Sequence, residues 1–270
     1  MRVEGVHPCP MLLGIDHLVI ACADPDAAVA DLEREVGLRA GGGGRHEALG
    51  TFNRLIWLGD TYLEFIGVFD RGLAQRSWIG SPTVRALDAG GGLATWAVVT
   101  DDIEGDVARL NADGAGLAEP IDGQRVRPDG DIVRWRLSTS RELGPERPPF
   151  LIEHDPTAAE WSPEDRAART AEIHPIGAAV RLTTLELPVA DMPGTIAGLM
   201  RTVRIGPFRP SLAGRGARDA GLGGQALRLT PRRPVAGADW PVPTVHLAVD
   251  APAGQQTVEI GGCRYVIGAP

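Results

Sequence analysis

The stretch GIDHLVIACADPDAAVADLEREVG, residues 14–37, determines the fold expected for this chain. Residues 14–21 are mostly apolar and include the β-branched Ile15, Val19 and Ile20, which predicts a strand. Asp24 follows as a helix N-cap, and Pro25 occupies the first helical position, where its missing N–H costs nothing. The helix is expected to end at Gly37, because glycine readily adopts the left-handed conformation found there. A strand followed directly by a helix is therefore the first part of a structural unit.

The same order of elements returns along the chain, which indicates a repeated unit. After the first helix, two strands are expected on either side of a tight Gly-Asp turn. A second copy and a weaker third copy follow, each with a strand, a capped helix and further strands, and the Pro/Gly/Arg-rich stretch 205–224 is expected to be a long loop. Ser81-Pro82 is expected to begin a short connecting helix. The later strands are predicted at 52–58, 62–68, 93–100, 117–126, 132–138, 150–154, 180–189, 225–230, 244–249 and 257–267.

The composition is that of a globular chain from a reducing compartment. The chain has 270 residues and 43% apolar content, enough for one or two domains with a self-sufficient core. Its cysteines, Cys9, Cys22 and Cys263, are far apart, so neither a disulfide framework nor a structural zinc site is indicated. No apolar run reaches the roughly 18 residues of a membrane span, and no signal peptide is apparent. We therefore expect a cytoplasmic protein.

The charged residues exclude several functions. The formal net charge is −8 and the pI is about 5.3, which argues against a nucleic-acid or anionic-membrane partner. All 27 basic residues are arginine. Schiff-base enzymes, pyridoxal phosphate (PLP) enzymes and P-loop proteins need a lysine amine, so these classes are excluded. Nothing in the sequence indicates a nucleotide or haem.

Alternate residues of a strand face the same side of its sheet. Leu18 in the first strand is expected to face the helix, which leaves His17 on the concave side. In the strand over 62–68, Leu63 faces the helix and Glu64 faces the concave side. One unit has a bare apolar face, so two units are expected to close around a hollow that holds a small molecule. His17 and Glu64 are predicted to meet in that hollow.

Glu64 and Glu153 each stand in an apolar strand. A carboxylate buried there needs a partner, a metal ion or a bound proton. Arg134 and Arg136 share one face of the strand next to Glu153, so one of them is expected to neutralise Glu153 or an anionic ligand.

Several short motifs occur in order along the chain. They are IDHLVIA (15–21), RH (45–46), GTFN (50–53), TYLE (61–64), RPDG (127–130), WR (135–136), FLIE (150–153) and HPIGA (174–178). This order resembles the glyoxalase-like branch of the vicinal-oxygen-chelate superfamily, over roughly residues 11–190. The resemblance implies an α+β fold of paired βαβββ modules that form a curved mixed sheet with helices outside, and a site in the hollow of the sheet.

The resemblance also implies a cofactor. In metal-dependent members, a His or Gln on the first strand and a Glu on the last strand of each unit bind a divalent metal ion. Carried over, these positions are His17, Glu64 and Glu153. The fourth position falls at Thr95 instead of a histidine, so the chain departs from the family pattern there, and a water or His46 is the candidate to fill it.

Further residues are candidates for contact with a ligand. Two of them flank the glycine run 41–44, which is expected to be flexible, and their alternative role is to stabilise that loop. The two arginines are candidate anion clamps, for which surface pairing is the alternative. His154 is expected to be structural. The candidates are His46, Asn53, Trp57, Arg127 and Arg136.

Three functions are compatible with these residues. The first is an enzyme in which Glu64 acts as a base or metal ligand together with His17, with isomerase, lyase and dioxygenase reactions open. The second is a protein that sequesters a drug or metabolite without turning it over, and the third is a scaffold whose hollow is filled. The expected organisation is a paired domain over 11–157, a helical linker over 158–179 and a third, degenerate unit over 180–270. A homodimer is expected by analogy.

Overall fold

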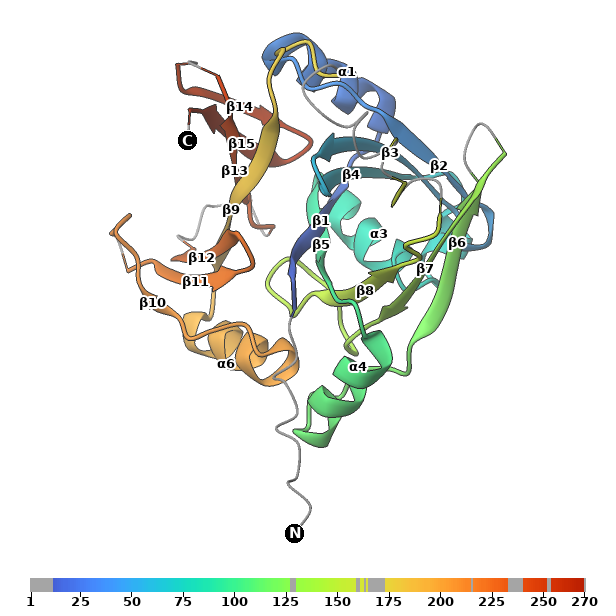
Figure 1. The fold of residues 1–270 in the computed structure, drawn as a ribbon, viewed down its shortest axis with the longest axis vertical. Coiled ribbons are helices and arrows are strands. Elements are labelled where there is room, and N and C mark those ends of the chain that lie inside the picture. The colour runs from blue at the N-terminus through green and yellow to red at the C-terminus, as the bar shows by residue number, and fades with distance from the viewer. Residues whose placement is uncertain are drawn as a thin grey trace.

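The computed structural model describes residues 12–126, 130–158, 161, 162, 164, 173–214, 216–232, 240–251 and 254–269. These residues form two mixed β-sheets with helices packed on them (Figure 1). The predicted α+β fold of paired βαβββ modules is confirmed. Arg127 and half of the predicted linker over 158–179 lie outside the described residues. None of the described helices combines the length and the apolar character needed to cross a membrane.

The first sheet contains both units of the predicted pair. Its described strands are β1 (Gly14–Ala21), β2 (Gly42–His46), β3 (Thr51–Leu58), β4 (Thr61–Val68), β5 (Gly92–Val99), β6 (Ile121–Val126), β7 (Ile132–Ser138) and β8 (Phe150–His154). They lie in the order β2-β3-β4-β1-β5-β8-β7-β6, and the two units meet where β1 and β5 pair antiparallel. The outer strands β2 and β6 contact each other, so the sheet curls into a nearly closed ring (Figure 1).

Helices cover the outside of the ring and also enter it. Helices α1 (Pro25–Val36) and α4 (Ile103–Ala112) pack their apolar residues with Leu18 and Leu63 on the outer face. The Asp24 side chain accepts the Ala27 N–H at 3.0 Å, as the predicted cap requires. The connecting segments are η1 (Glu47–Leu49), α2 (Arg71–Ala74) and α3 (Gly80–Asp88).

Helix α3 packs inside the ring, against the concave face of the sheet (Figure 1). Its beginning differs from the prediction, because α3 starts at Gly80 and Ser81 is not its cap. The hydroxyl of Ser77 accepts the Gly80 N–H at 3.0 Å instead. The helix therefore closes part of the space that the two units enclose.

The predicted flexible glycine run is largely a strand. Residues 42–46 form β2 and pair with β3. Gly43 has a φ of +141°, and a Cβ atom there would lie 2.3 Å from the Asn53 carbonyl oxygen. Only glycine fits this position without moving the backbone of β3.

The second sheet repeats the same plan with fewer residues. Its described elements are β9 (Val180–Val189), α6 (Met192–Val203), β10 (Arg209–Pro210), β11 (Arg218–Leu222), β12 (Gln225–Pro231), β13 (Thr244–Val249), β14 (Gln256–Ile260) and β15 (Cys263–Gly268). The strand order is β10-β11-β12-β9-β13-β15-β14. The stretch 205–224, predicted as a loop, contains β10 and β11, and the single strand predicted over 257–267 is divided by a Gly261-Gly262 turn.

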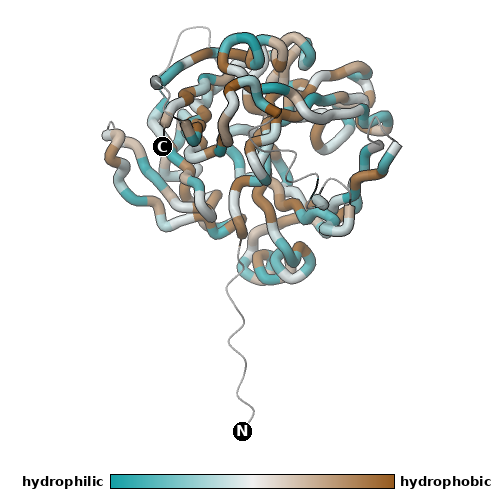
Figure 2. Tube along the Cα trace, turned by 45° about the horizontal axis from the view of Figure 1, so that its top comes forward, coloured by the Kyte–Doolittle hydropathy of each residue, from teal (hydrophilic) through white to brown (hydrophobic). Residues whose placement is uncertain are grey.

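The two sheets share one apolar core. Leu18 and Leu63 of the first sheet belong to the same buried cluster as Leu185 and Leu229 of the second. Hydrophobic and hydrophilic residues alternate along many of the elements (Figure 2). Such an alternation is typical of elements that have one apolar and one polar side. The second sheet thus packs on the outer face of the first sheet. The concave face of the first sheet is left for a site.

Candidate functional site

The first strand carries a β-bulge at Asp16. Ile15 pairs with Val98 and His17 pairs with Ala97 of β5, so Asp16 has no partner opposite it. Such an extra residue re-aims the side chains next to it. Asp16 and His17 are each 3% exposed, and Nδ1 of His17 lies 2.5 Å from Oδ1 of Asp16.

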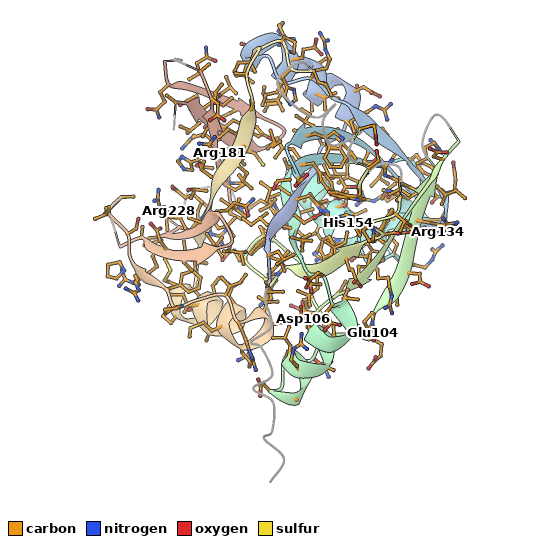
Figure 3. The ribbon with its side chains drawn as sticks, viewed as in Figure 1. Glu104, Asp106, Arg134, His154, Arg181 and Arg228 are labelled. Carbon is orange, nitrogen blue, oxygen red and sulfur yellow. The ribbon has the colours of Figure 1, made fainter. Side chains whose placement is uncertain are left out.

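Asp16 also binds a second imidazole. Nε2 of His154, which lies inside the ring (Figure 3), is 2.8 Å from Oδ2 of Asp16. Burial raises the pKa of Asp16, but the charges and hydrogen bonds of His154 and His17 outweigh it and hold this pKa well below its usual range. Because a carboxylate only accepts hydrogen bonds, the two ring nitrogens that face Asp16 carry protons. Nε2 of His17 and Nδ1 of His154 then remain for other partners.

The carboxylate of Glu64 lies beside the outward nitrogen of His17. Its Oε2 is 3.5 Å from Nε2 of His17, and Nδ2 of Asn53 donates to its Oε1 at 2.7 Å. Glu64 is 8% exposed and Asn53 is 3% exposed. A carboxylate and an imidazole at this separation, shielded from water, can exchange a proton with each other and with a bound molecule.

Two polar side chains enter the hollow from the outermost strands. Nδ1 of His46 lies 3.0 Å from Oγ1 of Thr51, and burial lowers the pKa of His46, which favours a neutral ring at neutral pH. Arg125 is 7% exposed, and its Nη1 donates to the Gly43 carbonyl at 3.4 Å. Arg125 therefore joins β6 to β2 and brings a buried positive charge to the hollow.

Aromatic rings form most of the wall of the hollow. The Tyr62 ring stacks on His17 with 4.4 Å between centroids, and the Trp161 ring lies 4.3 Å from that of His154. The hollow contains about 600 Å³ of space between atoms, part of it open to solvent. These dimensions and walls suit a small, largely apolar molecule. The aromatic residues are Trp57, Tyr62, Trp78, Trp135, Phe150 and Trp161.

Two buried hydrogen-bond acceptors at the hollow have no donor among the described residues. They are Oδ1 of Asn53 and Nδ1 of His154. Both accept hydrogen bonds when Asn53 donates to Glu64 and His154 donates to Asp16. Buried polar atoms are normally paired, so these two point to a donor on a bound molecule or water.

The structure brings together most of the residues singled out in the sequence. His17, His46, Asn53, Trp57 and Glu64 all line the hollow. The predicted meeting of His17 and Glu64 is therefore present in the geometry. What each residue does in binding or catalysis remains a prediction.

The predicted positions of Glu153 and Arg136 in the hollow are wrong. On β8, Ile152 and His154 line the hollow, so Glu153 between them faces away from it. Arg136, its partner across the strands, pairs with Glu104 of α4 at 2.5 Å on the outer surface. Both residues line a separate surface depression at β6, β7 and β8.

The sequence reading missed several residues of the hollow. His154, expected to be structural, lies two positions after Ile152, and this period of two is the signal that could have placed it. The bulge that turns Asp16 inward and the closure that brings in Arg125 depend on strand pairing, and no local pattern marks them. The other missed residues include Trp78, Phe150 and Trp161.

The residues present do not fit the divalent metal site that the resemblance implies. Glu153 lies on the other face, and Thr95 is fully buried with an Oγ1 that has no hydrogen-bond partner among the described residues. Within the described ranges, no group of three or more His, Cys, Asp or Glu side chains is placed to hold a metal ion. His17 and Glu64 alone supply too few ligands for a protein-held ion.

Comparisons with known proteins agree with this fold. Residues 15–203 match the family described as "Glyoxalase-like domain". A solved structure of a hypothetical protein from Staphylococcus aureus is 16% identical, with a TM-score of 0.75 over 95% of this chain and 99% of that chain. Methylmalonyl-CoA epimerase from Mycobacterium tuberculosis is 19% identical, with a TM-score of 0.42 over 56% of this chain and 95% of that chain. A search of curated proteins found no match.

Proposed function

Because this chain belongs to the glyoxalase-like domain family, and because its hollow holds a carboxylate beside an imidazole, we propose that it is an acid–base enzyme. It holds a small carbonyl compound in the hollow and moves a proton at the carbon next to the carbonyl group. The reaction is of the isomerase or lyase type. The divalent metal ion of the sequence-based hypothesis has no role in this proposal.

The observation that carries the proposal is the arrangement of Asp16, His17 and Glu64. Asp16 accepts a hydrogen bond from Nδ1 of His17, and the opposite ring nitrogen lies 3.5 Å from Glu64. A carboxylate behind an imidazole fixes its tautomer and stabilises its protonated form. Burying three such groups in a row, each at least nine-tenths buried, has a desolvation cost. A function of the site would explain why the protein bears this cost.

The proton steps follow from these positions. Glu64 takes a proton from the carbon next to the carbonyl, and the electron pair of the broken C–H bond forms an enolate. The buried guanidinium of Arg125 stabilises the negative charge on the enolate oxygen. Glu64 passes this proton to Nε2 of His17, and the His17 ring, held by Asp16, returns it to the enolate, so both residues end in their starting states.

The lining of the hollow supports a particular class of ligand. Six aromatic residues suit a flat apolar body. The two unpaired acceptors, Oδ1 of Asn53 and Nδ1 of His154, suit a hydroxyl donor, and Arg125 suits a carbonyl or enolate oxygen. Together these features favour a small aromatic hydroxyketone.

Hydrogen exchange tests the proposal. Purified protein is incubated in D₂O with 2-hydroxyacetophenone, and loss of the proton signal next to the carbonyl is followed by NMR. We expect exchange above the buffer rate, and a loss of about 100-fold or more in Glu64→Gln. Glu186→Gln is the matched control, because Glu186 also lies beside a histidine, at 3.4 Å from His246, but on the second sheet. Its exchange rate should equal that of the unmodified protein.

Two results would contradict an enzyme. Exchange that survives in Glu64→Gln would remove the carboxylate as the base. Binding of the ketone, seen as quenching of tryptophan fluorescence, with no exchange above buffer would make the protein a sequestering protein. The aromatic wall is the feature that favours this second function.

A further inference from the structure

A glutamine from the second sheet reaches the backbone of the first strand. The amide Oε1 of Gln225 accepts the Ile15 N–H at 2.6 Å, and its Nε2 lies 3.2 Å from the Ile15 carbonyl oxygen. The same Nε2 lies 3.1 Å from Oγ1 of Thr61, whose hydroxyl also donates to the Ile15 carbonyl at 3.2 Å. One side chain thus satisfies both backbone groups of Ile15 on that side of β1.

These hydrogen bonds take the place of ladder bonds that β4 does not make to Ile15. β1 and β4 are paired from His17 and Tyr62 onward, and β4 begins at Thr61, so Ile15 lies before the ladder starts. On its other side β1 is paired with β5, where the bulge falls between Ile15 and His17. The Gln225 amide therefore holds the residue directly before the bulged Asp16.

The turn between β11 and β12 lies very close to the start of β1. Gly223, at the turn between β11 and β12, has a φ of +60°, and a Cβ atom there would lie 2.1 Å from the Leu13 carbonyl oxygen. A Cβ atom on Gly14 would lie 2.9 Å from Oε1 of Gln225. Two glycines allow the turn and the start of β1 to approach this closely.

The bulge needs support because its consequences extend into the hollow. Asp16 has to aim one oxygen at His17 and the other at His154. A bulge interrupts the ladder and lets the strand bend. A small rotation at Ile15 would move the Asp16 carboxylate away from one of the two imidazoles.

We propose that Gln225 is a positioning residue for the site: by holding the Ile15 backbone it fixes the Asp16 bulge, and Asp16 in turn orients His17 and His154. This assigns the second sheet a part in a site to whose lining it contributes no residue. The inference deepens the proposed function, on which its relevance to catalysis rests. The positioning itself is measurable without any substrate.

The test is the tautomer of the two histidines, read from the ¹⁵N NMR shifts of their ring nitrogens. The spectra are recorded above the usual titration range of histidine, roughly pH 6.5. In the unmodified protein we expect His17 protonated at Nδ1 and His154 at Nε2. Gln225→Met keeps the side-chain volume but removes all the hydrogen bonds, and we expect it to lose the Nδ1–H signal of His17 in part or in full. Asp16→Ala, which removes both acceptor oxygens, serves as the reference for complete loss.

Two further variants separate positioning from general loosening. Trp240→Phe removes another hydrogen bond to the first sheet, from the indole N–H to the Leu93 carbonyl of β5 at 3.1 Å, and should leave both tautomers unchanged. Thr61→Val removes only the hydroxyl, so it should give a smaller change than Gln225→Met, and it serves if Gln225→Met does not fold.

Unchanged ¹⁵N shifts in folded Gln225→Met, or in Thr61→Val if only that variant folds, would overturn the inference. So would an equal change in Trp240→Phe. Failure of the proposed function has a different signature, because it appears as absent hydrogen exchange in the unmodified protein while the histidine tautomers still respond to Gln225→Met.

Discussion

The two sheets of this protein share a strand order but differ in what they enclose. In each, an antiparallel central pair is flanked by parallel neighbours: β4-β1-β5-β8 in the first sheet and β12-β9-β13-β15 in the second. The first sheet curls until β2 contacts β6. In the second, β10 has two residues, and no strand follows β14 at the edge within the described residues. Within the described residues, the second sheet therefore does not curl into a nearly closed ring as the first one does.

This difference in closure changes the environment of the polar side chains. In the ring, Asp16 and Glu64 are buried and have imidazoles and an amide as partners. On the second sheet, Glu186 and Asp219 pair with Arg228, the residue labelled in Figure 3, and these side chains are 21–30% exposed. Acidic residues on the open sheet are paired with arginine, whereas the enclosed ones are paired with imidazoles and an amide. The same strand order thus yields a structural surface in one place and a candidate site in the other.

The largest effect that separates the two sheets is expected at their aspartates. Asp16→Ala should lower the free energy of unfolding by about 3 kcal/mol, because it leaves two buried imidazoles without their shared partner. Asp219→Ala removes a carboxylate that pairs with Arg228 at 2.9 Å on the open sheet, and should cost about 1 kcal/mol or less. Urea unfolding followed by circular dichroism measures both. Equal losses would mean that enclosure does not distinguish the two groups of charges.

A second contrast concerns glycines in the outer strands. Gly43→Ala places a Cβ atom 2.3 Å from the Asn53 carbonyl oxygen at a φ of +141°, and should cost about 2 kcal/mol. It should also weaken ligand binding, since it displaces Asn53. Gly221→Ala in β11 has no atom within 4 Å of the new Cβ and should change stability by less than about 0.5 kcal/mol. Thermal unfolding of both variants decides, and a tolerated Gly43→Ala would show that the closure of the ring is loose.

A smaller effect should appear on acidification. Burial lowers the pKa of His46 in the hollow and of His174, whose ring lies 2.7 Å from the Trp57 carbonyl and accepts the Arg39 N–H. The unfolded chain takes up these protons below about pH 6.5, while the folded chain does so only at lower pH. Between the two values the unfolded state holds more protons, so stability falls as the pH falls, by up to about 1.4 kcal/mol per pH unit for each histidine.

The variant His174→Gln isolates one of these two contributions. Its unfolding free energy, measured between neutral pH and about pH 5, should fall less steeply than that of the unmodified protein. An identical slope would assign the pH dependence to other groups.

The smallest effect is expected at the residue that faces away from the hollow. Arg136→Gln removes ion pairs to Glu104 and Asp122 on the surface, and should change stability by about 0.5 kcal/mol or less. Ligand affinity, measured by fluorescence titration, should stay the same. A loss of affinity would return Arg136 to the role of an anion clamp that the sequence suggested.

The fold was predictable from the sequence because its signals are local. The cap at Asp24, the C-terminal Gly37 and the period of two in 14–21 each depend on a few adjacent residues. The same period placed His17 and Glu64 on one face. At Glu153 the resemblance was wrong, because it put this carboxylate in the hollow, whereas the period of two along β8 puts Ile152 and His154 there.

What the sequence alone determined is the order of the elements, their helical or extended character and the side of the sheet to which most side chains belong. The tertiary structure decided that β2 and β6 close around the hollow, that Asp16 bulges between two histidines and that Gln225 reaches it from the second sheet. Backbone periodicity is set by neighbouring residues, whereas bulges, closure and cross-sheet contacts depend on pairing with residues far away in the chain, which no local pattern records.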